Sequence, residues 1–187
     1  MLRALGPGSV SSVLKVGLDV FHVLLWVLLG SAVLGLVALL IAQPFIVANM
    51  NVEGSLDGET DPDRIRDLLR GPIIPGVVAA ATIYLGGLVF IVGRLRRVFT
   101  TLTQGDPFQP ENVRRLRSIG FALGGIERLS YAVRAVLGWI DRQQDIDFRR
   151  VGEDFNLTIW FAVLAVLVLA EVFREGARLR REAELTI

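Results

Sequence analysis

Long apolar runs separated by charged segments dominate the chain. Residues 118–140 form one such run with three charged interruptions, whereas the other runs contain no Asp, Glu, Lys or Arg: residues 22–51, 71–93 and 157–170. A helix rises about 1.5 Å per residue and crosses the hydrocarbon core of a membrane with about 20 residues. We therefore predict a single all-α, polytopic membrane domain with four transmembrane helices, at approximately residues 17–43, 73–95, 118–140 and 156–173.

The third of these segments is the least apolar, because Glu127, Arg128 and Arg134 lie inside it. Each charge at the centre of a membrane helix costs about 2.5–3.5 kcal/mol on insertion scales. If this segment stayed on the membrane surface, the fourth helix would carry the basic C-terminal residues 174–181 to the outside, against the tendency of basic segments to stay in the cytoplasm. Four crossings satisfy this rule for every loop, and three do not.

Basic residues also predict how the chain is threaded. The protein has 187 residues, with 20 basic and 19 acidic side chains. Residues 1–18, 94–118 and 171–187 contain 12 of the basic residues, whereas residues 43–72 and 141–156 contain six of them and 11 of the acidic residues. We therefore expect both termini and the middle loop in the cytoplasm. The first apolar run exceeds the 7–15 residues or so of a signal peptide, which favours a retained helix.

The sequence offers few of the residue types and motifs that catalytic sites use. The chain has no cysteine and one histidine, and no zinc or phosphate-binding motif is recognisable, so we expect no enzymatic activity, cofactor or metal site. A net charge of +1 gives no reason to expect nucleic acid as a direct partner. In the external loop 44–72, Asp61 and Pro62 are typical of the start of a short amphipathic helix. Membrane topology and helix capping explain the carboxylates of residues 57–63 better than calcium does.

Several charged and polar residues fall inside or at the rim of the predicted membrane helices, and we group them as an intramembrane polar network: Asp19, His22, Glu127, Arg128, Arg134 and Glu171. Because an unpaired charge in the membrane is costly, we expect Arg128 to pair with Glu171 or Asp19. The spacing of Glu127 and Arg134 puts them on one helix face, predicted to look into a four-helix bundle. Such residues either specify helix packing or form a proton or ion path, and both interpretations stay open.

Two cytoplasmic segments carry the most specific pattern. They are Val98 to Gly120, with the sequence VFTTLTQGDPFQPENVRRLRSIG, and a tail containing Leu169 to Leu179, LAEVFREGARL, followed by ELTI. The two segments, in this order, resemble the bacterial inner-membrane family named domain of unknown function 2975. The resemblance covers the last three helices well, and the first 45 residues match only in hydropathy. It implies a multi-pass protein of the bacterial inner (plasma) membrane, and a small helix-turn-helix regulator as a cytoplasmic partner.

Two classes of function follow from these observations. The first is a non-enzymatic membrane protein that tethers or signals to a cytoplasmic regulator through its middle loop and its helical tail, residues 174–187. The candidate contacts are Phe108, Arg114, Arg178 and Arg181. The tail arginines are equally suited to anchoring on anionic lipid of the bilayer. The second class is a small transporter or ion-coupled channel using the intramembrane charges, for which four helices would need a homo-oligomer.

Overall fold

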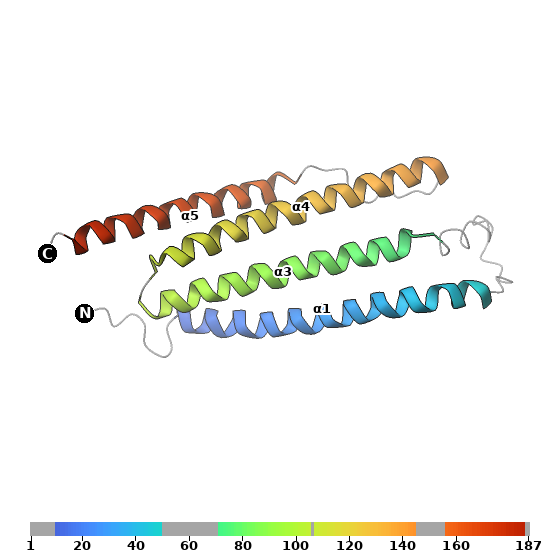
Figure 1. The fold of residues 1–187 in the computed structure, drawn as a ribbon, viewed down its shortest axis with the longest axis horizontal. Helices are drawn as coiled ribbons and strands as arrows, with labels where there is room; N and C mark the ends of the chain where they lie inside the picture. Colours follow the sequence, from blue (N-terminus) through green and yellow to red (C-terminus); the bar gives the residue numbers. More distant parts are fainter. Residues whose placement is uncertain (1–9, 50–70, 106, 145–155, 186–187) are drawn as a thin grey trace.

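The computed structural model describes residues 10–49, 71–105, 107–144 and 156–185, and all four elements in them are α-helices (Figure 1). In chain order these are α1 (Val10–Asn49), α3 (Ile73–Thr103), α4 (Pro110–Gln144) and α5 (Leu157–Glu184). Each is longer than the crossing predicted for it, because helical hydrogen bonding continues into the polar flanks. In particular, α1 passes through Pro44 to Asn49, so residues 44–49 belong to the helix and not to a loop. The predicted short helix and the carboxylates of residues 57–63 lie outside the described residues.

The helices form an open layer and not the closed four-helix bundle that we expected. Consecutive helices run antiparallel and side by side, as Figure 1 shows. Among the described residues, α1 packs on α3, α3 also packs on α4, and α4 packs on α5, with no packing between α1 and α5. Lipid solvates apolar side chains as well as another helix does, so a membrane protein has no hydrophobic reason to close such a layer.

Three of the four helices are long and apolar enough to cross a membrane: Val16–Phe45, Ile73–Thr103 and Leu157–Ala183. The chain is therefore a multi-pass membrane protein. Large apolar side chains are exposed along these helices, for example Ile41 and Phe161. Helix α4 does not qualify on hydropathy, yet it lies between α3 and α5 over much of their length. Its neighbours therefore determine its position.

Close glycine contacts fix the level of each helix against the next. A Cβ atom at Gly87 of α3 would lie 2.5 Å from Cδ1 of Ile126 in α4, and one at Gly120 of α4 would lie 2.9 Å from Cδ2 of Leu167 in α5. Only glycine permits these approaches without a shift of the neighbouring side chain. These contacts define which residues of α3, α4 and α5 share a depth.

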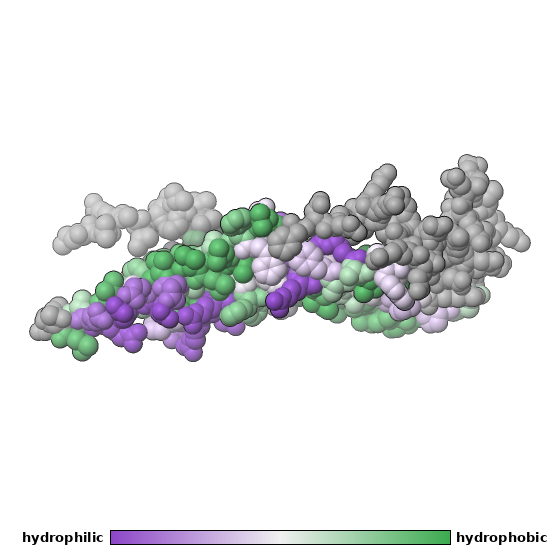
Figure 2. All heavy atoms as spheres, turned by 90° about the horizontal axis from the view of Figure 1, so that it is seen from above, coloured by the Kyte–Doolittle hydropathy of each residue, from purple (hydrophilic) through white to green (hydrophobic). Residues whose placement is uncertain are grey.

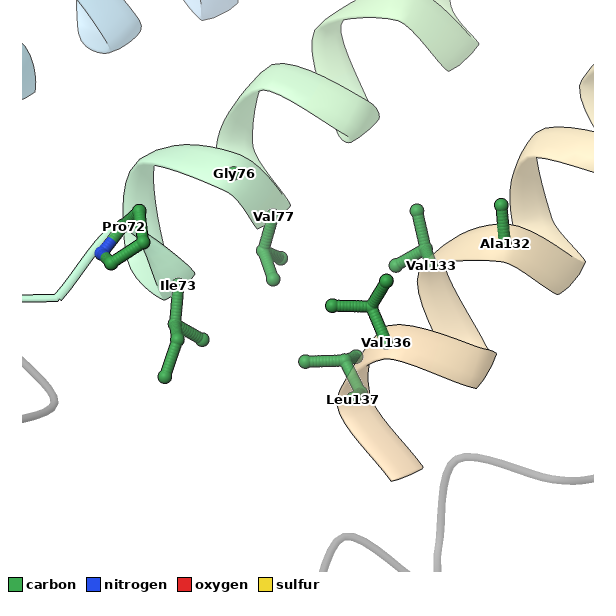
Figure 3. A pocket seen from close by; sticks show the side chains of 8 residues that line it. All are labelled: Pro72, Ile73, Gly76, Val77, Ala132, Val133, Val136 and Leu137. Carbon is green, nitrogen blue, oxygen red and sulfur yellow. The ribbon is translucent and has the colours of Figure 1, made fainter. Parts of the chain in front are cut away.

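The start of α1, the α3–α4 connection and the end of α5 lie together at one end of the molecule, which we call the basic end (Figure 1, left). Its described arginines are Arg94, Arg96, Arg97, Arg114, Arg115, Arg117, Arg174, Arg178, Arg180 and Arg181. Figure 2 shows the hydrophilic side chains gathered where α5 terminates. Towards the opposite end, an apolar groove with a volume of about 280 Å³ separates the start of α3 from the last turns of α4. Figure 3 shows Val77 pointing across it towards Val133 and Val136.

Candidate functional site

A buried side-chain amide holds the basic end together. Asn112, in the first turn of α4, is fully buried. Its Nδ2 donates to Oγ1 of Thr101 in α3 at 2.6 Å and to the carbonyl oxygen of Pro107 at 2.9 Å. Its Oδ1 accepts a hydrogen bond of 2.8 Å from Nη1 of Arg115. One residue thus joins the end of α3, the connection and the start of α4.

The connection between α3 and α4 also packs on α5 through Phe108, and we call its described residues, 104–105 and 107–109, the docked loop. The ring of Phe108 lies 5.6 Å from that of Phe173, centroid to centroid. A Cβ atom at Gly176 would be 2.6 Å from Cδ1 of Phe108, so the ring rests on the glycine backbone. Gly105 turns the chain after α3 with φ of 82°, a conformation that favours glycine. Phe108, predicted as a partner contact, therefore fastens the loop to α5 although its side chain remains partly exposed.

Ion pairs at the basic end connect neighbouring helices. Nε of Arg96 in α3 lies 2.5 Å from Oδ1 of Asp19 in α1. Nη2 of Arg117 in α4 lies 3.6 Å from Oε2 of Glu171 in α5, and Arg174 pairs with the other oxygen of the same carboxylate. Both predicted rim carboxylates are therefore paired, one to α3 and the other within the α4–α5 pair.

The expected pair between Arg128 and either of these carboxylates is not formed. Arg128 is exposed, and no hydrogen bond or ion pair joins it to another described residue. Glu171 lies at the level of Arg117, which is about 16 Å along α4 from Arg128 at 1.5 Å per residue. Asp19 belongs to α1, and α3 separates α1 from α4. The network predicted as one unit is thus divided into separate groups.

A second polar group lies between α4 and α5, deeper in the layer. Glu127 is 3% exposed, and its Oε1 lies 3.6 Å from Nη2 of Arg134. Neither of these two atoms has a hydrogen-bond partner among the described residues. The guanidinium of Arg134 also stacks over the ring of Tyr131, 4.8 Å from its centroid. The Tyr131 hydroxyl accepts a hydrogen bond of 3.2 Å from Nε1 of Trp160 in α5, so the group connects the two helices.

His22 lies one turn beyond Asp19 on α1. Its Nε2 accepts a hydrogen bond of 3.0 Å from Nε1 of Trp26, one turn along α1. Its ring lies against α3, because a Cβ atom at Gly93 would be 3.2 Å from Cε1 of the histidine. Within the described part of the chain, no three His, Asp or Glu residues come together as a metal site would require. The geometry is that of a hydrogen-bonded packing residue.

The remaining predicted partner contacts are exposed arginines at the basic end. Arg114 pairs with Glu111 at 3.2 Å, and Arg178 pairs with both Glu175 and Glu182, at 2.9 and 3.3 Å. Nε of Arg181 donates to the carbonyl oxygen of Ala177 at 3.5 Å. Each of these interactions joins residues of the same helix on its exposed surface, so the three guanidinium groups remain accessible.

The sequence reasoning missed the residues that build this end: Thr101, Asn112 and Gly176. A polar signal did exist, because Asn112 follows a Gly-Asp-Pro turn and sits in the first turn of a helix whose first residue is Pro110. An Asn side chain near a helix start tends to hydrogen-bond to neighbouring backbone groups, so its position indicates a specific hydrogen bond. No comparable signal identifies Gly176, since its role depends on the approach of Phe108 from a distant part of the chain.

Comparison with known proteins agrees with the two segments quoted above. No curated protein and no solved structure matches the chain significantly. A family model does match residues 47–187, which include the last three helices, the docked loop and the C-terminal segment. The match leaves out most of α1, the part of the chain in which only hydropathy resembles the family. The chain therefore belongs to the family described as Protein of unknown function (DUF2975).

Proposed function

We propose that the protein is a non-enzymatic component of the bacterial inner membrane that binds a cytoplasmic protein at its basic end. In this proposal all four helices cross the membrane, and both termini are cytoplasmic. The distribution of arginines supports the orientation, because basic segments remain on the cytoplasmic side. The common location of the α1 start, the docked loop and the α5 end supports an even number of crossings.

The packing of α4 supports its membrane placement despite its charges. Ile126 lies against Gly87 in the apolar part of α3, and Gly120 lies against Leu167 in the apolar part of α5. If α3 and α5 cross the bilayer, the segment of α4 between these contacts lies in it too. The buried pair of Glu127 and Arg134 lowers the cost of that placement.

The observation that carries the functional proposal is the docking of the loop on α5. Asn112 and Phe108 hold the loop, the first turn of α4 and the α5 tail in one arrangement. A rigid surface loses less conformational entropy on binding than a flexible one does. Arg178 and Arg181, exposed on the tail beside this loop, are suited to an acidic protein surface. The helix-turn-helix regulator implied by the family resemblance is the first candidate partner.

Co-purification tests this proposal. The detergent-solubilised full chain is used to capture the candidate regulator expressed with it. The double variant Arg178→Glu and Arg181→Glu is expected to lose capture, because it reverses two exposed charges of the tail. The matched control is Arg128→Ala, which removes a guanidinium from the layer far from the tail and should capture normally. Equal capture by the double variant and the parent protein would contradict the proposal.

The buried pair of α4 favours a second candidate function, an ion-coupled transporter or channel. Oε1 of Glu127 and Nη2 of Arg134 are buried and have no hydrogen-bond partner among the described residues, and ionisable groups inside membrane proteins often mark ion paths. Four helices in an open layer enclose no path, so such a function needs an oligomer. Flux in proteoliposomes that is lost in Glu127→Gln, together with normal activity of the tail variant, would favour transport over tethering.

A further inference from the structure

With α4 placed in the membrane as proposed above, an exposed arginine lies in the middle of the layer of helices. Arg128 is two residues beyond Ile126, which contacts Gly87 of α3. Gly87 lies inside the charge-free run of residues 71–93, six residues before its end, and the antiparallel course of α4 puts Arg128 further from that end. From Arg117, at the basic end, Arg128 is about 16 Å further along α4. This distance exceeds the reach of an arginine side chain, so Arg128 cannot extend its guanidinium to the polar boundary on that side.

No described residue neutralises this charge. Arg128 is exposed, and its guanidinium has no hydrogen bond or ion pair within the described part of the chain. The nearby Glu127 is buried on another side of α4, where it pairs with Arg134. An unpaired guanidinium among lipid tails is unfavourable, and membrane proteins normally give such groups a partner.

The surface around Arg128 is suited to a helix. Exposed residues spaced three or four apart form one face of α4: Phe121, Gly125, Arg128, Ala132, Ala135 and Trp139. Residues next to the arginine are small, and a Cβ atom at Gly125 would meet nothing within 4 Å. Small side chains allow the backbone of a second helix to approach closely. The other sides of α4 are occupied by α3 and α5.

Charge complementarity selects the occupant. A second copy joined face to face would put Arg128 near another Arg128. Among the described acidic residues, Glu127 alone is near this depth, and it is buried and paired. We propose that the α4 face around Arg128 binds an apolar transmembrane helix of another protein, which carries a carboxylate at the same depth. This proposal shares the membrane placement of α4 with the proposed function, but it is independent of the cytoplasmic partner.

Cysteine cross-linking can test the proposal directly, because the protein has no cysteine of its own. The full-length Gly125→Cys variant is reconstituted in vesicles of phosphatidylcholine and phosphatidylglycerol. The probe is a synthetic transmembrane helix of leucine and alanine with one cysteine and one central glutamate. Control probes carry glutamine or lysine instead. We expect roughly three- to twentyfold more disulfide cross-linking with the glutamate probe, the range measured for polar contacts between membrane helices.

Substitution of the arginine provides the second arm. Adding Arg128→Leu should remove the preference for glutamate while helical content, measured by circular dichroism, stays unchanged. Arg128→Glu should shift the preference to the lysine probe. Equal cross-linking of the glutamate and lysine probes to the parent face would refute the proposal. Efficient cross-linking of Gly125→Cys to its own second copy, undiminished by the glutamate probe, would also refute it.

Two controls separate this proposal from the proposed function. Capture of the cytoplasmic regulator should not change in Arg128→Leu. A cysteine at Gln104, tested for protection from an impermeant reagent in intact cells, reports the orientation independently of both partners. A failure of the cross-linking experiment alone therefore leaves the tethering function intact, and a failure of regulator capture alone leaves the helix-binding face intact.

Discussion

Replacing Asn112 by alanine should open the basic end. The substitution removes the donor for the Pro107 carbonyl and the acceptor for Arg115, and it leaves a cavity where a fully buried side chain was. Thr101 still donates to the carbonyl of Val98, so its hydroxyl is not left without a partner. The substitution removes three hydrogen bonds of about 0.5–1.5 kcal/mol each, and the Pro107 carbonyl that loses its donor is only partly buried.

We therefore expect a loss of about 2–3 kcal/mol in the free energy that keeps the docked loop closed, including a small contribution from the cavity. Since 1.4 kcal/mol corresponds to a factor of about ten, the open population should rise roughly 30- to 150-fold. Local opening of this kind need not unfold the membrane helices. The effect should therefore be confined to the basic end.

Thiol labelling measures this opening. Ala177 is 6% exposed and adjoins Gly176, on which the ring of Phe108 rests. In the background Ala177→Cys, the labelling rate of the single thiol reports how often this end opens. The matched control, Arg115→Ala, removes one of the three hydrogen bonds of Asn112 and leaves its two donors paired, so we expect less than about a fivefold change. A labelling rate for Asn112→Ala within threefold of the background would refute the reasoning.

Three further outcomes are expected. Gly176→Leu should displace the ring of Phe108 and raise the labelling of the same thiol, because its Cβ alone would overlap the ring; unchanged labelling would contradict this contact. Glu127→Gln should lower the free energy of unfolding of the purified protein by about 3–5 kcal/mol, because Arg134 is left with an uncompensated charge. Adding Arg134→Gln should restore much of this loss. Additive losses from the two substitutions would contradict the pairing. In intact cells, an impermeant thiol reagent should label a cysteine at Gly58 or at Gln144, which are expected outside the cytoplasm. The reagent should not label a cysteine at Gln104, which is expected inside.

The sequence predicts the helices well because hydropathy reports directly on a membrane environment. The helical tail predicted for residues 174–187 continues α5 as a charged helix to Glu184, beyond the apolar part that hydropathy locates. Pairs such as Arg178 with Glu175 and Glu182 stabilise that extension, and they contribute little to hydropathy. A hydropathy profile therefore locates the apolar part of each helix and not its ends.

The pairing of the charges could be predicted only in part. Depth along a helix can be counted from the sequence, but the direction of a side chain requires the neighbouring helices. Glu127 and Arg128 are consecutive, so they point about 100° apart around α4, and one is buried while the other is exposed. Lipid and a neighbouring helix accept apolar side chains equally well, so the hydropathy pattern does not distinguish an open layer from a closed bundle.

The exposed position of Arg128 changes the effect on stability that we expect from Arg128→Ala. The sequence alone predicts a marked loss of thermal stability, because an acidic partner inside the protein would be left without a countercharge. In the structure no described carboxylate contacts this arginine, so its removal should leave the stability of the isolated protein unchanged or raise it. A marked loss would indicate a partner outside the described residues.

The nearest-neighbour order of the layer has a consequence for biosynthesis. Each helix after the first packs on the helix that precedes it in the chain, so this contact can form as soon as the helix has been synthesised. No contact between the first and the last helix is needed to complete the fold of the described residues. Contacts of low sequence separation form quickly. Helix α4, too polar to be retained in lipid alone, would emerge beside a finished α3 and be secured when α5 follows. The protein can therefore be inserted into the membrane helix by helix, and its most polar helix enters where a neighbouring helix is already in place.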